Sequence, residues 1–322
     1  MTAPTRLSST TAAPAPAVAA LPLQGFLLLA LLSVLWGVNW PILKIALADF
    51  PVLSFRAGCL VFGGGALLAV ARLTGSPIAL RRDRLKPMLL VSAINITAWH
   101  CLSGFAITMI PSGRAAIIGY TMPVWGVLLG ALVLHETLTW RRLLSLALGA
   151  AGLAVLLAAD LGASKGVPVG ALLMAGAALA WALGTIGNKK VDWGMPATVV
   201  VAWQCLLGGA PIVVAALIAD YGSWTAPSLW GLLALVYNLT CAFVIGHYVF
   251  FKVVLLFPVG VATIGTLAIP IIGLFSGALV LGEPLGATEF SALGLVVCAL
   301  AIPVLTQPRG FAPTRALRTP RP

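Results

Sequence analysis

Long apolar runs, separated by short polar or charged segments, make up most of the chain between residues 23 and 306. Each run is about 20 residues long, the length that an α-helix needs to cross a bilayer. The pattern predicts ten transmembrane helices, at 23–43, 51–72, 87–108, 113–134, 141–159, 168–187, 197–219, 228–250, 259–281 and 289–306. Because the connections are short, we expect neighbouring helices to pack antiparallel.

One stretch of the chain occurs twice. Residues 110–136 (IPSGRAAIIGYTMPVWGVLLGALVLHE) align without a gap to residues 257–283 (FPVGVATIGTLAIPIIGLFSGALVLGE), at an offset of 147 and with twelve of the twenty-seven positions identical. Each copy carries a proline, Pro123 or Pro270, near the middle of its apolar run. Proline removes a helical hydrogen bond and bends a helix, so both positions are predicted hinges. Paired broken helices in two related halves point to the central site of a transporter.

The repeat divides the chain into two five-helix halves, 23–160 and 161–307, between tails at 1–22 and 308–322 that we expect to be disordered and cytoplasmic. Fifteen of the nineteen basic residues fall on one side of the predicted helices. The positive-inside rule makes that side cytoplasmic, so both termini are expected there. Because each half has an odd number of helices, the two halves must insert in opposite orientations.

Composition narrows the class of protein. The chain is 61% hydrophobic and 8% charged, with a mean hydropathy of +1.08, whereas soluble proteins average about 25% charged residues. The net charge of +11 does not indicate nucleic-acid binding, because the basic residues lie between apolar runs. All five cysteines fall inside predicted spans without a CxxC pair, so no metal or disulfide is expected. With no zinc-protease or GxSxG motif either, the sequence indicates no enzyme and no cofactor.

Several segments together resemble the EamA family of the drug/metabolite transporter superfamily. They are LWGVNWPILKIAL, FPVLSFRAGC, AWALGTIGNKK and the two repeated stretches, and the resemblance covers about residues 23–306. It implies an all-α membrane protein with ten transmembrane helices, arranged as two inverted five-helix repeats around a central cavity. Spans 1–4 and 6–9 would surround the cavity, and spans 5 and 10 would lie outside it. Many relatives in this family export amino acids or other small metabolites.

Polar and aromatic residues at helical spacing mark the expected cavity, because such groups at membrane depth face a cavity or a neighbouring helix rather than lipid. The candidate substrate-binding residues are Trp40, Asn95, Trp99, His100, Tyr120, Trp181, Trp203, Tyr237, His247 and Tyr248. Each has a structural alternative. The tryptophans are also typical of interfacial anchors, and the amides of Asn95, Gln204 and Asn238 are typical of interhelical hydrogen bonds.

Charged residues near the span ends also have two interpretations. Lys44, Arg114 and Lys189 are typical of side chains that reach the headgroups. Glu136 and Glu283 end the two repeated stretches, where they either anchor a loop or couple transport to protons.

The two histidines at 100 and 247 are equivalent under the repeat, since 247 − 100 = 147. A buried neutral imidazole can simply bridge two helices. Alternatively, the pair lines the transport path, where imidazole could bind a substrate carboxylate or respond to proton concentration.

No Asp or Glu lies near the middle of any predicted span. An antiporter that exchanges cationic drugs for protons needs such a carboxylate, so its absence argues against an antiporter of this kind.

We therefore expect an inner-membrane secondary transporter that exports small metabolites, in particular amino acids or related zwitterions, by alternating access. The alternatives left open are an exporter of lipophilic drugs, a carrier resembling those for nucleotide sugars, and a non-transporting membrane protein. The expected partners are a small-molecule substrate and the lipid bilayer, with no nucleic acid, and the chain is expected to be a monomer or a weak homodimer.

Overall fold

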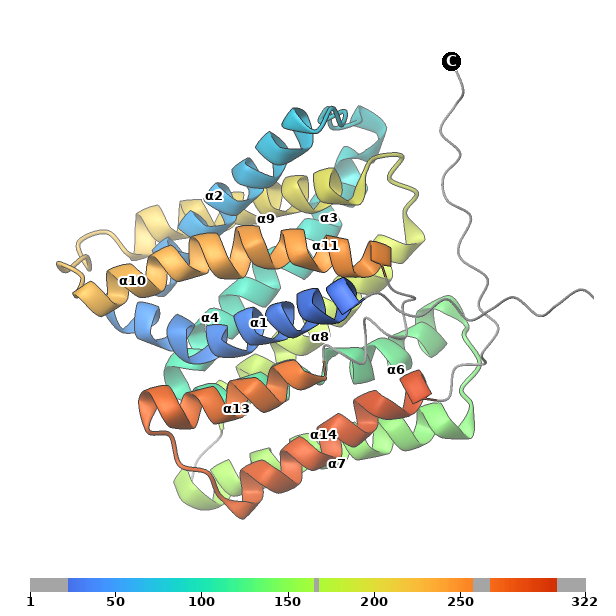
Figure 1. Cartoon of the computed structure of the whole chain (residues 1–322), viewed down its shortest axis with the longest axis vertical. Coiled ribbons are helices and arrows are strands. Elements are labelled where there is room, and N and C mark those ends of the chain that lie inside the picture. The colour runs from blue at the N-terminus through green and yellow to red at the C-terminus, as the bar shows by residue number, and fades with distance from the viewer. Residues whose placement is uncertain (1–22, 165–167, 257–266, 306–322) are drawn as a thin grey trace, which may run out of the picture.

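The computed structural model describes residues 23–164, 168–256 and 267–305, and the regular elements within these ranges are all helices (Figure 1). In the first half they are α1 (Leu23–Asp49), α2 (Val52–Leu73), α3 (Leu85–Ser92), α4 (Trp99–Met109), α5 (Ser112–Gly119), α6 (Met122–Leu134) and α7 (Trp140–Ser164). In the second half they are α8 (Val169–Lys190), α9 (Ala197–Ala219), α10 (Leu229–Tyr237), α11 (Gly246–Leu256), α13 (Ala268–Leu281) and α14 (Ala287–Leu305).

Eight helical stretches of the described residues are long and apolar enough to cross a membrane. This agrees with an all-α membrane protein that crosses the bilayer several times. Two shorter apolar helices, Ala268–Leu281 and Ala287–Ile302, lie within or close to the predicted spans 259–281 and 289–306. Most of the first residues of the former span, 259–266, are outside the described residues.

Prolines set where several helices begin. Pro51, Pro111, Pro168 and Pro196 directly precede α2, α5, α8 and α9. Proline has no N–H to donate, and it disfavours helical backbone in the residue before it. A new helix can therefore start after each proline, while the preceding segment cannot continue into it as a helix.

Two spans contain a π-helical segment. The segment η2 (Ala93–Ala98) joins α3 to α4, and η3 (Asn238–Ile245) joins α10 to α11. Shifting η2 by the repeat offset gives 93 + 147 = 240 and 98 + 147 = 245, a range that lies within η3. The two halves therefore depart from α-helical geometry at matching positions, a feature that the sequence pattern did not predict.

The helix of the first repeated stretch is interrupted a few residues before the bend expected at Pro123. The chain breaks at Tyr120–Thr121, between α5 and α6, and Pro123 occupies the first turn of α6. Proline costs little there, because first-turn N–H groups have no partner in the helix. Pro270 likewise lies in the first turn of α13. Thr266 lies four residues earlier, and its carbonyl would lack a helical partner because proline has no N–H. Thr266 is outside the described residues.

The ends of α6 and α13 share a left-handed cap. His135 (φ 54°) follows α6, and Gly282 (φ 66°) follows α13, at positions related by the offset, 135 + 147 = 282. The next residue closes the same turn in both copies: the N–H of Glu136 donates to Gly130 O, and that of Glu283 to Gly277 O. Histidine is an uncommon choice here, because a β-carbon disfavours positive φ.

Helix packing follows a regular scheme. The helix α2 packs along α9, and α7 packs along α14 at one edge of the bundle (Figure 1). Between these pairs, α1 lies against α13 and α11, while α8 lies against α6 and α4. The pair at the edge is joined by a hydrogen bond from Ser145 Oγ to Ala299 O (2.6 Å).

Candidate functional site

The two histidines related by the repeat lie on α4 and α11. The Nδ1–H of His247 donates to Phe243 O (2.7 Å), since a carbonyl can only accept. Its ring stacks on Phe243 (centroids 4.6 Å apart) and meets Trp36 edge-on (5.8 Å). His100, in contrast, has a buried Nδ1 without a hydrogen-bond partner among the described residues. The two histidines therefore differ: the Nδ1 of His247 is hydrogen-bonded, and the Nδ1 of His100 has no partner among the described residues.

Arg56 of α2 is a buried cation that was not among the candidate residues of the sequence. Its place near the start of a predicted span is typical of a side chain that reaches the headgroups, yet it is only 7% exposed. Its Nη2 donates to Ser103 Oγ of α4 (3.2 Å), and its buried Nε has no partner among the described residues. His100 lies one turn before Ser103 on α4. The available signal was a single arginine one turn inside an apolar run.

Asn95, Trp99 and Trp181 connect the third and sixth predicted spans. The rings of Trp99 and Trp181 meet edge-on, with centroids 5.1 Å apart. Asn95, in the π-helical segment η2, donates from Nδ2 to Trp181 O (3.2 Å). Asn95 is buried and both indoles are half-buried, so this group forms an aromatic wall held by an interhelical hydrogen bond.

Trp40 and Tyr120 lie at the helix break of the first repeated stretch. The indole of Trp40 is so close to Gly119 that an added β-carbon there would lie 2.9 Å from its Cη2. A β-carbon at Gly273 of α13 would lie 3.2 Å from Trp40 Cδ1. Tyr120 is buried directly after α5. Trp40 thus spans α5 and α13, and both of these helices contact α1.

Tyr237 and Trp36 bind the backbone across α1 and the eighth predicted span. The hydroxyl of Tyr237 donates to Leu35 O (2.8 Å), and Trp36 Nε1 donates to Ala242 O of η3 (3.1 Å). The π-helical segment therefore supplies acceptors, at Ala242 and Phe243, to the two rings that meet in this region.

Two predicted site residues do not join these groups. Trp203 Nε1 donates to Ile78 O (2.9 Å), in the loop that follows α2, so this indole binds a loop near the end of the bundle. Tyr248 is 56% exposed, and the ammonium group of Lys252 lies over its ring (5.6 Å). Tyr248 follows His247 directly, and successive helical residues point about 100° apart, so the two side chains face different surroundings.

Charged groups gather where α1, α5 and the α13–α14 loop meet. The carboxylate of Glu283 accepts hydrogen bonds from the backbone N–H groups of Ser112 (2.6 Å) and Gly113 (3.0 Å) and from Ser112 Oγ (2.8 Å). Lys44 Nζ lies 3.3 Å from Glu283 Oε1 and also donates to Ile110 O (2.7 Å). We call Lys44, Ser112, Gly113 and Glu283 the latch.

Electrostatics stabilise the ionised latch. Burial opposes ionisation of Glu283, but the hydrogen bonds from Ser112 and Gly113 and the charge of Lys44 together outweigh it, so the pKa of Glu283 lies below its ordinary value. A neighbouring pair, Arg114 and Glu289, approaches to 2.6 Å. For Glu283 this geometry favours loop anchoring, one of the two roles that its position in the sequence allowed.

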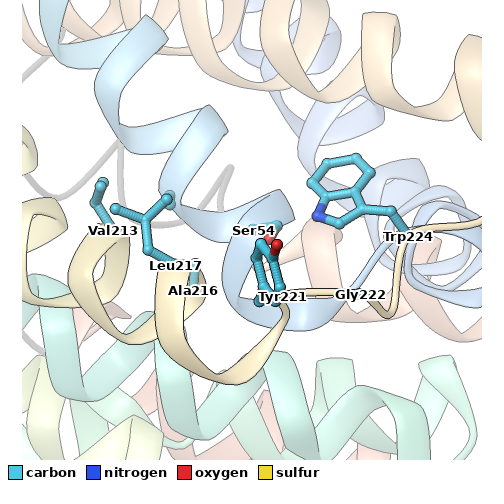
Figure 2. Close-up of a pocket in the computed structure, with 8 residues that line it drawn as sticks. Ser54, Val213, Ala216, Leu217, Tyr221, Gly222 and Trp224 are labelled. Carbon is cyan, nitrogen blue, oxygen red and sulfur yellow. The ribbon is translucent and has the colours of Figure 1, made fainter.

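A separate apolar cavity of about 420 Å³ opens where α2 and α9 meet the α9–α10 loop, and Figure 2 shows its lining. It is lined by Ser54, Ala57, Val213, Ala216, Leu217, Tyr221, Gly222 and Trp224. Ser54 donates through both N and Oγ to Asp220 Oδ2 (2.7 and 2.8 Å), which ties the start of α2 to the end of α9. None of the predicted site residues lines this cavity.

No cluster of His, Cys, Asp and Glu suited to a metal ion occurs among the described residues.

Comparisons with known proteins agree on one family. The EamA-like transporter family model matches residues 23–158 and 168–305. A Bacillus subtilis protein described as an uncharacterized transporter, YvbV, is 34% identical over 285 residues, which cover 86% of this chain and 90% of that protein. A probable amino-acid metabolite efflux pump of Salmonella typhimurium is 29% identical over 305 residues (92% and 98%). A crystal structure, 21% identical, has a TM-score of 0.62 and covers 86% of this chain and 96% of its own, which shows a shared fold.

Proposed function

Because the chain belongs to the EamA-like transporter family, we propose that it is a secondary transporter that exports amino acids or related zwitterionic metabolites across the inner membrane. One observation carries the choice of substrate. Indoles, imidazoles, an amide and one guanidinium group, from α1, α2, α4, η2, α8 and α11, gather in the interior. Rings and amides suit the uncharged parts of such a cargo. Two of the related proteins are named as probable amino-acid metabolite efflux pumps, which supports this choice.

We propose ten transmembrane helices in two inverted halves. Two structural matches at the offset of 147 support a shared architecture of the halves. They are the π-helical segments, and the left-handed caps with the turns that Glu136 and Glu283 close. Helix packing supports it too, because exchanging the halves turns the α1–α13 contact into the α8–α6 contact. It also leaves the α2–α9 and α7–α14 pairs unchanged, as a twofold axis requires.

We propose that the latch is the closed outer gate. The distribution of basic residues favours a cytoplasmic N-terminus, and α1 would then deliver Lys44 to the periplasmic side. The latch joins α1, α5 and the α13–α14 loop, which belong to different halves. Opening it would separate the halves at that face, and the break at Tyr120–Thr121 would let α5 move relative to α6.

Transport by the purified full-length chain in proteoliposomes tests the proposal. Vesicles loaded with an unlabelled amino acid should accumulate the same labelled amino acid by exchange, for at least one member of a panel of the twenty standard amino acids. Empty liposomes, and liposomes that contain Gly113→Trp, which should obstruct the close contact of α5 with Leu274 of α13, serve as controls. Exchange of lipophilic cations or nucleotide sugars, with none of any amino acid, would replace this function by one of the alternatives.

A further inference from the structure

We propose that Arg56, with His100 and Ser103 of α4, forms the site that binds the carboxylate group of the exported metabolite. The inference rests on the proposed transport function and narrows its substrate class: the cargo must carry a carboxylate, whereas its amine is not bound by an opposite charge.

Arg56 is a buried cation without a counter-charge among the described side chains. Seven of the eight acidic residues have described side chains, and each is engaged elsewhere. Their partners are Ser228 for Asp49, Arg81 and Arg84 for Asp83, Arg142 for Glu136, Gly194 for Asp192, Ser54 for Asp220, Lys44 for Glu283 and Arg114 for Glu289. Burying an unpaired charge is costly, so natural proteins pair it or bind a ligand that supplies the opposite charge.

The guanidinium group of Arg56 has a hydrogen-bond donor that no described residue uses. One donor, Nη2, is used by Ser103, and the Nε–H is buried and unused within the described part of the chain. A guanidinium offers five donors in a planar fork that fits the two oxygens of a carboxylate. A neutral hydroxyl therefore satisfies only part of what Arg56 can bind, and an anion would satisfy the rest.

One face of α4 completes the site. His100, Ser103 and Gly104 lie at helical positions i, i+3 and i+4, which share a face. Gly104 lets α4 approach Arg56 closely, because a β-carbon there would lie 3.2 Å from Arg56 Nε. His100 adds an imidazole one turn before Ser103 on this face, with a buried Nδ1 that has no partner among the described residues. A carboxylate bound by Arg56 would thus find a hydroxyl and an imidazole donor beside it.

The charge balance favours a carboxylate over a phosphate. Arg56 supplies one positive charge to this region. Two other cations of the bundle, Lys44 and Arg114, are already paired with Glu283 and Glu289. A phosphate monoester carries nearly two negative charges at neutral pH and would leave one of them without a partner beside Arg56. A monoanion is balanced by Arg56 alone.

The experiment compares acids with amides, in which a neutral carboxamide replaces the carboxylate, on the purified full-length protein. In detergent, the shift in melting temperature is measured with the twenty standard amino acids, and then with two matched series. These series are leucine, leucinamide and 4-methylpentanoate, and phenylalanine, phenylalaninamide and 3-phenylpropanoate. The corresponding flux is measured in proteoliposomes. We expect the acids of at least one series, including the acid without an amine, to stabilise the wild type, and the amide to have no effect.

Variants link the effect to Arg56. Arg56→Gln should weaken acid binding at least about tenfold, the size expected for losing a hydrogen-bonded charge, and Arg56→Lys should restore part of it. The matched control is Arg72→Gln, which removes an exposed arginine at the other end of α2 and should bind like the wild type. If Arg56→Gln does not fold, Arg56→Lys and Ser103→Ala carry the test, and both should weaken acid binding while amide binding stays absent.

The outcomes separate the two proposals. Acid and amide binding equally to the wild type, no stabilisation by any acid tested, or acid binding that survives in all Arg56 variants would each overturn the carboxylate site. Flux of both acid and amide that ignores Arg56 would leave the transport function standing and remove only the site. Arg56-dependent acid binding without any flux would leave the carboxylate site standing and remove the transport function.

Discussion

Lys44 and Glu283, 239 positions apart in the chain, form an ion pair (3.3 Å) that joins α1 to the loop between α13 and α14. The same carboxylate accepts two backbone hydrogen bonds at the start of α5. One side chain thus connects three segments from both halves of the chain. Glu136, its counterpart in the first repeated stretch, instead pairs with Arg142 near the surface (3.1 Å), with both side chains at least about a third exposed.

This difference leads to the first prediction. Glu283→Gln should lower the free energy of unfolding by about 1–3 kcal/mol, because it removes the charge from several buried hydrogen bonds. Glu136→Gln, the matched control, should cost at most about 1 kcal/mol, since exposed ion pairs contribute little. Thermal unfolding in detergent at pH 7 measures both. Equal losses in the two variants would mean that the latch has no special role in stability.

The pH dependence of the latch gives the second prediction. The pKa of Glu283 is lower in the folded protein than its ordinary value. A depressed pKa contributes stability that is fully present above the unfolded-state pKa, about 4.3, and is lost as the pH falls through the folded-state pKa. The stability difference between wild type and Glu283→Gln should therefore shrink as the pH is lowered from about 5 toward about 3. A difference that is constant over this range would contradict the ionised latch.

The third prediction concerns topology. In a variant without its five native cysteines, Ser76→Cys in the loop after α2 should react only with reagents that reach the cytoplasm. Ser223→Cys in the loop after α9 should react with reagents added to the periplasm. These loops are counterparts under the repeat, 76 + 147 = 223. Labelling of both from the same side would exclude inverted halves.

The fourth prediction concerns the prolines. Alanine at Pro123 supplies an N–H that can donate to Gly119 O four residues earlier, and this would extend α6 back toward α5. We expect Pro123→Ala and Pro270→Ala to slow exchange in proteoliposomes while membrane insertion and melting temperature are kept or raised. Pro211→Ala in α9, a proline within a helix outside the repeated stretches, is the control. Wild-type exchange in the double variant Pro123→Ala/Pro270→Ala would make these positions incidental to movement.

The fifth prediction concerns the aromatic wall. Trp99→Ala or Trp181→Ala should raise the half-saturating substrate concentration about 2- to 10-fold, the effect of losing roughly 0.5–1.5 kcal/mol of aromatic contact. Trp203→Ala should leave it nearly unchanged, because that indole binds Ile78 O in a loop. The measurement is the concentration dependence of initial exchange. A larger effect at Trp203 than at Trp99 and Trp181 would move the binding site away from α4 and α8.

The sequence alone predicts a good part of this fold. Apolar runs and prolines locate the helices, and the repeated stretch relates His100 to His247 and Pro123 to Pro270. These features are local or follow from comparing the chain with itself, so a linear pattern contains them. The left-handed caps at positions 135 and 282 match under the same offset, but they were seen only in the structure.

Other features depend on contacts between distant segments. Arg56 has the sequence environment of a residue that reaches the headgroups, and only the close approach of α4 at Gly104 makes it buried. Trp203 has the spacing of a cavity residue, but the loop after α2 folds back to accept its hydrogen bond. Because position in a span does not determine which neighbour a side chain meets, the sequence could not predict the surroundings of either residue.

The directions of the side chains that follow a π-helical segment depend on how many residues the segment contains rather than on which residues they are. Removing one residue from η3, such as Val244, would allow ordinary α-helical hydrogen bonds through this span. Every residue after the deletion would then rotate by about 100° about the helix axis. His247 would turn away from Trp36, and the carbonyl groups that now accept from both rings would be taken up by the helix itself. Such a deletion would complete the helical hydrogen bonds of this span and would also remove the side-chain contacts that it makes with α1. A deletion of one residue within η2 would turn His100 and Ser103 away from Arg56.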